Sequence, residues 1–244
     1  MTTSASSAAT SSASRSARSS GDTEPARAAG RPGPWPIVVF DLDGTLADTI
    51  ELIVESYQHA FRTVLGAEED EAVIRSWIGR TLITAFRAHA PGHADELYAE
   101  YLRWNAANTE RLLRGYAEIR ELLGELADAG LQLGVATSKR RASARQAMEL
   151  LGIAPFLPVL VALEDTDAHK PDPEPVLLAV ERLGGRPPQA VYVGDAVVDV
   201  LAGKAAGMAT VAVTWGAGRP DALAAAEPDA VATTPADLRA LLLP

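Results

Sequence analysis

The residues of this sequence best suited to chemistry are aspartates that stand directly behind short, β-rich apolar runs. Asp41 and Asp43 follow the run at residues 37–40, and Asp195 follows a later run, with Asp199 four residues beyond it. The carboxyl ends of the strands of an open α/β sheet lie side by side, so these carboxylates should converge in one cleft. They would repel each other unless a hard cation lay among them, and oxygen ligands without His or Cys specify Mg²⁺. The pattern therefore predicts a magnesium site.

The pair Asp41 and Asp43 has the spacing for phosphoryl transfer. The residues are two positions apart, so both side chains can reach the same site if the backbone stays extended. One carboxylate can attack as a nucleophile while the other moves a proton. An anion that attacks an anionic phosphate needs the metal and a lysine to neutralise the charge, and Lys170, in a proline-bounded loop, is the candidate.

Neighbouring residues have the chemistry to bind a phosphoryl group. Gly44 lets the backbone approach a ligand closely because it has no side chain. Thr137 and the amide of Ser138 follow a further apolar run and can donate hydrogen bonds to phosphoryl oxygens. The predicted phosphate-binding residues are Gly44, Thr137, Ser138 and Lys170.

The elements that must position these residues alternate between strands and helices. Strands are predicted at residues 37–40, 131–136, 158–163, 190–193 and 210–213. Helical periodicity appears at residues 116–129, 143–151, 174–183, 199–206 and 236–243. Strands that alternate with helices form βαβ units, so we predict an α/β fold with a Rossmann-like parallel sheet and helices on both faces.

A long helical segment separates the first strand from the second. Apolar residues at three- and four-residue steps predict a helix over residues 50–65, capped by Asp48 or Thr49, and further helices up to about residue 104. Such a segment can cover the end of the sheet. The predicted parts are a disordered Ser- and Ala-rich tail at residues 1–34, a core at residues 35–47 and 117–244, and an all-helical cap at residues 48–116.

Four short motifs resemble those of the haloacid dehalogenase-like hydrolase superfamily, in the order of that family. Residues 41–49, Asp-Leu-Asp-Gly-Thr-Leu-Ala-Asp-Thr, are similar to its first motif, which is highly specific. Thr137-Ser138 resembles the second motif, Lys170-Pro171 the third, and residues 194–199 the fourth. The similarity covers about residues 36–244, and the helical segment resembles the cap that follows the first motif in this family.

The resemblance implies a role for each of these residues. Asp41 would be the nucleophile that forms an aspartyl-phosphate, and Asp43 would act first as general acid and then as general base. Thr137 and Lys170 would bind the phosphoryl group, and Lys170 would also orient Asp41. The implied Mg²⁺ ligands are Asp41, the carbonyl of Asp43, and Asp195, with Asp199 reaching the ion directly or through water.

Two further segments resemble the phosphoglycolate phosphatase-like branch, which also includes pyrophosphatases and nucleotidases. They are residues 78–82, Ile-Gly-Arg-Thr-Leu, and the pair Trp215-Gly216. This resemblance implies a Mg²⁺-dependent phosphatase for small phosphate monoesters. From the cap, Arg80 and Arg87 are candidates to contact the leaving group of the substrate.

The fourth motif departs from the family pattern at two positions. Ala196 and Val197 replace the hydroxyl and charged residues that often follow its first Asp. The change could remove a hydrogen bond near the metal site. Since all the carboxylates are present, we expect altered efficiency rather than loss of activity.

Other activities on this scaffold fit less well. A dehalogenase lacks an acid two residues after its nucleophile, where this chain has Asp43. A phosphonatase needs a cap lysine, and no lysine precedes Lys139. A sugar phosphomutase of the β-phosphoglucomutase type stays open, although His59 lies too late to match its usual cap histidine. A non-enzymatic binding module is disfavoured because Asp41 and Asp43 are both intact.

Composition limits the partners and the compartment. The chain has a formal net charge of −10 and no cysteine, which disfavours nucleic acid as a partner and excludes disulfides and thiolate metal sites. No apolar stretch is long enough for a membrane span. The first 34 residues also resemble an organellar transit peptide, but without an amphipathic pattern of arginines we interpret them as a tail. We expect a cytoplasmic protein that binds a small phosphorylated metabolite.

Overall fold

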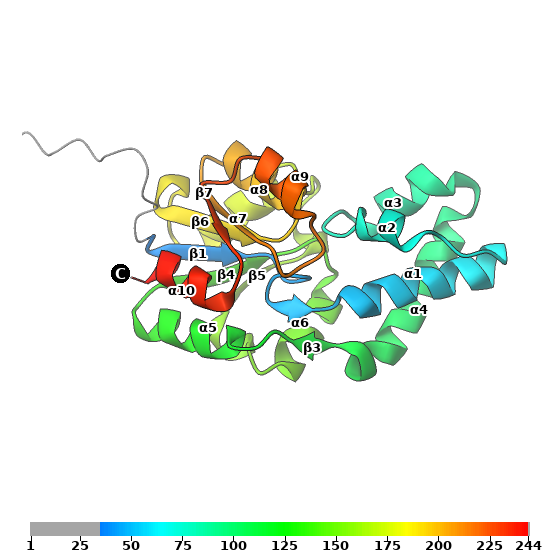
Figure 1. Cartoon of the computed structure of the whole chain (residues 1–244), viewed down its shortest axis with the longest axis horizontal. Coiled ribbons are helices and arrows are strands. Elements are labelled where there is room, and N and C mark those ends of the chain that lie inside the picture. The colour runs from blue at the N-terminus through cyan, green and yellow to red at the C-terminus, as the bar shows by residue number, and fades with distance from the viewer. Residues whose placement is uncertain (1–34, 244) are drawn as a thin grey trace, which may run out of the picture. The chain divides into compact units, whose positions relative to one another are not determined.

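A six-stranded parallel sheet is the main structural element of the chain (Figure 1). The computed structural model describes residues 35–243. The strands lie in the order β5-β4-β1-β6-β7-β8, and every neighbouring pair is parallel. Their bounds are β1 Ile37–Phe40, β4 Gln132–Ala136, β5 Val159–Val161, β6 Ala190–Gly194, β7 Ala209–Val213 and β8 Ala230–Ala232. The predicted α/β fold is confirmed. The predicted tail at residues 1–34 lies outside the described residues.

Alternate residues of β1 face opposite sides of the sheet, as a pleated strand requires. Val38 and Phe40 belong to the apolar cluster that α5, α6 and α10 cover, and Ile37 and Val39 to the cluster that α7 and α8 cover. The helix bounds are α5 Ile119–Asp128, α6 Arg141–Leu150, α7 Glu174–Arg182, α8 Val197–Ala205 and α10 Pro235–Leu242. All four residues are at most 2% exposed, so β1 is buried on both faces and fixed in position.

The segment between β1 and β4 is helical, and we refer to its helices, Ile50–Leu112, as the helical insertion (Figure 1). It comprises α1 Ile50–Leu65, α2 Glu71–Arg75, α3 Leu82–His89, a short 3₁₀ turn Pro91–His93 and α4 Ala94–Leu112. The insertion has its own apolar cluster, in which the rings of Tyr57, Phe86 and Tyr101 pack at centroid distances of 4.9 to 6.2 Å. The predicted helix at residues 50–65 is confirmed to its bounds.

Short elements were absent from the sequence prediction. They are the antiparallel pair β2 Ala47–Asp48 and β3 Arg114–Gly115, the strand β8, the helix α9 Pro220–Ala225, and the 3₁₀ turns Ala154–Phe156, Leu163–Asp165 and Pro187–Gln189. Each is six residues or fewer, which is too short to show a hydrophobic period. Within residues 35–243, no helix combines the length and apolar character that a membrane span needs.

Gly79 brings the helical insertion against the core. Its carbonyl accepts a hydrogen bond of 2.9 Å from the Ser138 hydroxyl, which lies just beyond β4. Its φ angle is +92°, and an added Cβ atom would lie 2.9 Å from Cβ of Ala196 and 3.1 Å from Cγ2 of Val198. The apolar residues of the fourth motif therefore leave room for a glycine, and only a glycine, at this contact.

Replacing Gly79 should loosen this contact. We expect Gly79→Ala to lower the free energy of unfolding by at least about 1–2 kcal/mol, from the left-handed backbone alone. Gly92→Ala is the matched control, because a Cβ atom there meets nothing within 4 Å. It should change stability by less than about 0.5 kcal/mol. Urea unfolding measures both variants, and equal stabilities would contradict the described packing at Gly79.

Candidate active site

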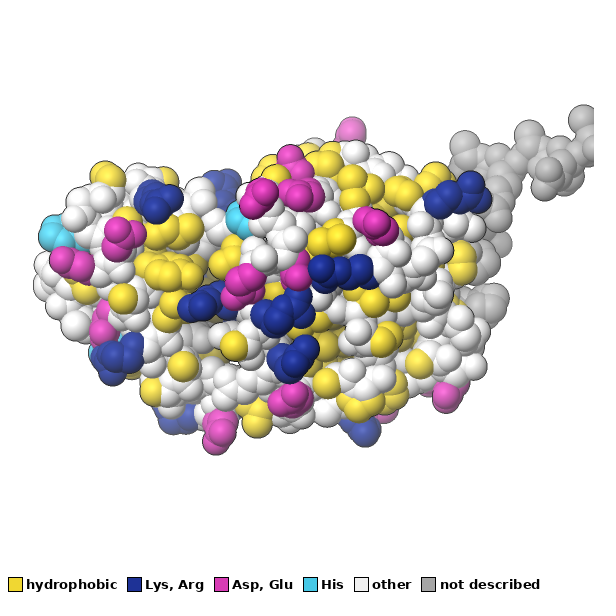
Figure 2. All heavy atoms as spheres, turned by 180° about the vertical axis from the view of Figure 1, so that it is seen from behind, with side chains coloured by type: hydrophobic (Ala, Val, Ile, Leu, Met, Phe, Trp, Pro, Cys, Tyr) yellow, Lys and Arg dark blue, Asp and Glu magenta, His cyan; other side chains and the backbone are white. Residues whose placement is uncertain are grey.

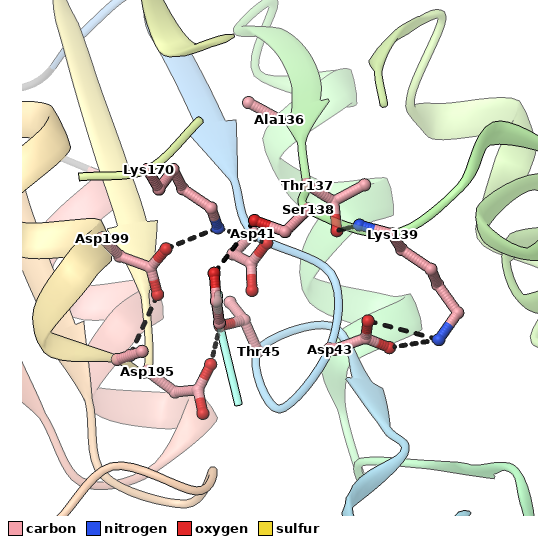
Figure 3. A network of polar contacts seen from close by, with 12 residues as sticks. Asp41, Asp43, Thr45, Ala136, Thr137, Ser138, Lys139, Lys170, Asp195 and Asp199 are labelled. Atoms are coloured by element: carbon pink, nitrogen blue, oxygen red, sulfur yellow. Dashed lines mark hydrogen bonds and ion pairs between the residues drawn. The ribbon is translucent and has the colours of Figure 1, made fainter. Parts of the chain in front are cut away.

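Three buried aspartates meet at the carboxyl edge of the sheet (Figure 3). Asp41 follows β1, Asp195 follows β6, and Asp199 lies in the first turn of α8. One carboxylate oxygen from each lies within 4.8 Å of the others, and each residue is at most 2% exposed. They converge because β1 and β6 are neighbours in the sheet. The Asp41 amide, just past the end of β1, still donates to the Val193 carbonyl of β6 at 2.8 Å. The sequence predicted that these three carboxylates and that of Asp43 would converge, and the structure brings together the three without Asp43.

Lys170 places a buried ammonium group between two of these carboxylates. Its Nζ atom donates to Oδ1 of Asp41 at 2.8 Å, to Oδ1 of Asp199 at 2.6 Å and to the hydroxyl of Tyr192 at 3.1 Å. Burial alone would lower the pKa of Lys170, but the Asp199 and Asp41 carboxylates outweigh burial and hold that pKa well above its ordinary value. The lysine is therefore charged and held beside the Asp41 carboxylate.

Asp195 is buried without a cation. Its Oδ1 accepts a hydrogen bond of 3.0 Å from the Thr45 hydroxyl, and its Oδ2 accepts one of 2.7 Å from the Ala217 amide. No Lys, Arg or His of residues 35–243 lies within 4.0 Å of its oxygens. The backbone of Gly44, at φ +81°, passes so close that a Cβ atom would collide with this carboxylate. Because Gly44 has no side chain, its backbone can lie against the Asp195 carboxylate. The close approach seen in the structure is thus to Asp195, whereas the predicted one was to a ligand.

The donor set fits a hard divalent cation. Three buried carboxylates share one ammonium, which leaves an excess of negative charge in a site that excludes water. Burial raises the pKa of Asp41 to about 7, although Lys170 opposes this, and burial with the neighbouring Asp199 and Asp41 raises the pKa of Asp195 well above its ordinary value. Oxygen ligands of this charge suit Mg²⁺, which would keep these carboxylates ionised.

Asp43 lies apart from this group (Figure 3). Its carboxylate pairs with Nζ of Lys139 at 2.9 and 3.2 Å and accepts a hydrogen bond of 2.8 Å from the Thr49 hydroxyl. Thr49 precedes α1 as predicted, but its hydroxyl makes no capping bond to the helix because it serves Asp43 instead. No role was predicted for Lys139, although its place directly after Thr137-Ser138 indicated that it lies at the same sheet edge.

The predicted phosphate-binding residues Thr137 and Ser138 differ in their partners. Thr137 is 4% exposed, its amide continues the β4–β5 ladder by donating to Val161 at 2.9 Å, and its hydroxyl accepts from the Lys139 amide at 3.2 Å. The hydroxyl of Ser138 is already engaged with the helical insertion at Gly79. The Thr137 hydroxyl and the Ser138 amide, which donates to no group of residues 35–243, therefore remain in place to donate to a ligand.

A pocket opens between the sheet edge and the helical insertion, and Asp41 and Asp43 lie in its wall. Aromatic residues of the insertion line the opposite side: Tyr57, Trp77, Tyr98 and Tyr101. Arg80 and Arg140 bring positive charge to the same pocket. Arg87 is exposed on α3 and is not among the lining residues, so the structure brings only one of the two predicted cap arginines to the site. Figure 2 shows basic side chains gathered near the middle of the rear face, with acidic side chains among them.

Comparisons with known proteins agree with this geometry. A family model described as haloacid dehalogenase-like hydrolase matches residues 38–213. One relative is the pyrophosphatase PpaX of Bacillus pumilus, which is 37% identical over 84% of this chain and 95% of its own length. Another is the pyrophosphatase PpaX of Bacillus velezensis, which is 39% identical over 82% of this chain and 93% of its own length. A solved structure described as a predicted phosphoglycolate phosphatase from Haemophilus somnus has a TM-score of 0.75 at 24% identity, over 84% of this chain and 96% of that one, and shows the same fold.

The raised pKa of Asp41 predicts a pH-dependent stabilisation by Mg²⁺. Its ordinary pKa is 3.8 and its folded pKa is about 7, so the metal-free folded state holds a proton that the unfolded chain lacks between these values. The contribution of Asp41 to the stability of the metal-free protein therefore falls as pH rises through this window. Mg²⁺ binds the ionised carboxylates and must displace that proton, so its stabilising effect grows with pH.

Thermal unfolding with EDTA and with saturating Mg²⁺ tests this linkage. The increase in Tm caused by Mg²⁺ should be larger at about pH 8 than at about pH 5.5, by at least about 2 °C, which corresponds to about 1 kcal/mol in a protein of this size. Asp41→Asn should weaken the pH dependence of the increase. The same increase at both pH values would contradict the linkage.

Proposed function

Because the chain belongs to the haloacid dehalogenase-like hydrolases, we propose that it is a Mg²⁺-dependent phosphatase of small phosphorylated metabolites. The observation that carries the proposal is the buried Asp41 carboxylate, which is paired with Lys170 at 2.8 Å and lies in the wall of the pocket. A carboxylate buried this deeply, beside a fixed ammonium and further carboxylates, has the setting of a nucleophile rather than of a surface ion pair.

The reaction proceeds in two displacements. An oxygen of Asp41 attacks phosphorus in line with the leaving oxygen, and the P–O bond to that oxygen breaks as Asp43 donates a proton to it. The product is an aspartyl-phosphate on Asp41 and the free leaving group. Asp43, now a carboxylate, removes a proton from water, the hydroxide attacks phosphorus, and Asp41 and inorganic phosphate are regenerated. Mg²⁺, which Asp41, Asp195 and Asp199 would hold, would supply positive charge to the phosphoryl oxygens, while Lys170 holds Asp41 and Thr137 donates to the phosphoryl group.

The substrate carries a second anionic group. Arg80 and Arg140 line the pocket together with Asp41, and Arg80 makes no ion pair with any of residues 35–243. Pyrophosphate, whose leaving group is itself phosphate, ranks first because the relatives above are named pyrophosphatases. Phosphoglycolate ranks second, since its carboxylate offers a similar charge and the motifs at residues 78–82 and 215–216 resemble that branch. A cytoplasmic location agrees with such substrates and stays a prediction.

Phosphate release across a substrate panel tests the activity. Pyrophosphate, phosphoglycolate, a nucleoside monophosphate and a sugar phosphate are each offered with Mg²⁺, and we expect pyrophosphate and phosphoglycolate, the two small compounds with a second anionic group, to be turned over fastest. Asp41→Asn should retain less than about one thousandth of the wild-type rate, because loss of a nucleophile removes the first step. EDTA should stop turnover. Isomerisation of glucose 1-phosphate without phosphate release would instead favour a mutase, and binding without any turnover would favour a binding module.

Arg80 and Arg87 provide a matched pair for the leaving-group subsite. Arg80→Met should raise KM for pyrophosphate about tenfold and leave kcat within about threefold, since it removes binding that the ground state and the transition state share. Arg87→Met removes the same charge from an exposed position outside the pocket and should leave KM within about twofold. Steady-state kinetics measures both. An equal effect of the two variants would show that only the general charge of the insertion matters.

A further inference from the structure

Lys139 is a second mostly buried lysine at the site, and the catalytic steps above make no use of it. Its side chain is 11% exposed, and its Nζ atom lies within hydrogen-bond distance of both oxygens of Asp43 (Figure 3). Lys170 already serves Asp41 and Asp199, and Lys204, the remaining lysine of the chain, is on α8 with its Nζ bonded to the Ala226 carbonyl. The site thus has one lysine for the nucleophile and a separate one for Asp43.

The backbone of Lys139 is held on both sides. Its amide donates to the Thr137 hydroxyl at 3.2 Å, and its carbonyl accepts from the Leu163 amide at 3.0 Å. These bonds tie the residue to the ends of β4 and β5, the same sheet edge that carries the nucleophile. A lysine side chain is flexible in solution, but one that starts from a fixed backbone and ends in an ion pair loses much of that freedom.

The carboxylate of Asp43 depends on this contact for its direction. It belongs to none of the close contacts of the group of Asp41, Asp195 and Asp199, whose negative charges repel it. The Thr49 hydroxyl supplies one hydrogen bond to Oδ1, but Lys139 is the only cation of residues 35–243 within 4.0 Å. Without the charge of Lys139, the Thr49 hydroxyl alone would have to hold the Asp43 carboxylate against the repulsion of the neighbouring aspartates.

The direction matters because Asp43 and Lys139 line the same pocket. A general acid must lie within hydrogen-bond reach of the oxygen that it protonates, so a carboxyl that rotates away loses the reaction even if it stays in the site. We propose that Lys139 is a positioning residue of this enzyme, which holds Asp43 toward the leaving-group oxygen and so determines which leaving groups can be expelled. This inference rests on the proposed phosphatase function and extends it to poor leaving groups.

Leaving groups of different quality separate this role from a structural one. p-Nitrophenyl phosphate and phenyl phosphate have similar shapes, but p-nitrophenolate leaves readily without a proton and phenolate does not. The quantity to compare is kcat/KM, which covers the steps up to release of the leaving group. Lys139→Met should lower it about 100-fold for phenyl phosphate, within the range that a general acid contributes, and less than about fivefold for p-nitrophenyl phosphate.

Matched variants complete the experiment. Lys139→Arg keeps the charge and should restore much of the activity on phenyl phosphate, whereas Lys204→Met, the same change far from the pocket, should leave both substrates unaffected. The double variant Lys139→Met with Asp43→Asn should be no slower on either substrate than Asp43→Asn alone, because Lys139 acts through Asp43. Thermal unfolding of each variant shows whether it is folded.

Each other outcome decides against the proposal in a distinct way. An equal loss of kcat/KM on both substrates from Lys139→Met overturns the positioning role, and so does a further loss in the double variant, which would mean that Lys139 contacts the substrate directly. If Lys139→Met does not fold, Lys139→Arg decides instead. A folded Lys139→Arg variant that loses activity equally on both substrates overturns the positioning role as well. A wild-type protein that releases no phosphate from pyrophosphate or from any ester would overturn the proposed function itself.

Discussion

The ammonium group of Lys170 lies between the carboxylates of Asp41 and Asp199 and pairs with both. The rest of the site depends on how the remaining negative charge is stabilised. One positive charge cannot neutralise three buried carboxylates, so Asp195 depends on two hydrogen-bond donors, and the three carboxylates together fit a divalent cation. Burial makes each of these interactions stronger than it would be in water, and it makes an unbalanced charge costly. The neighbouring positions of β1 and β6 therefore matter chemically, because they determine which charges meet.

The loops around this group are held by a second layer of hydrogen bonds. Thr45 donates its hydroxyl to Asp195, and its carbonyl accepts from the indole of Trp215 at 3.1 Å. The turn after β1 and the loop after β7 thus hold each other in place, and both contact the same carboxylate, since Ala217 in the second loop donates to it as well. Asp195 has a fixed direction although it has no ion-pair partner among residues 35–243, and a metal ligand needs that fixed direction.

The sequence predicted the parts of the structure that follow from periodicity and strand ends. The order of strands and helices, the helix at residues 50–65 and the convergence of Asp41, Asp195 and Asp199 all belong to this class. The partners of Thr45 and Lys139 do not, because they depend on side-chain directions and on which loop crosses the sheet edge. Arg80 and Arg87 show the same limit: both lie in the helical insertion, and only the folded backbone shows that one of them borders the pocket.

Every carboxylate of the buried group, and Lys170 with it, comes from the sheet strands, their loops and α8, whereas the helical insertion supplies no member of it. The insertion instead provides the far wall of the pocket, from a segment with its own apolar cluster. The buried carboxylates and the aromatic wall of the pocket are thus encoded in separate stretches of the gene. Substitutions in the insertion can therefore change this wall without altering the buried carboxylates, an arrangement that lets the pocket diverge while the carboxylate group is kept.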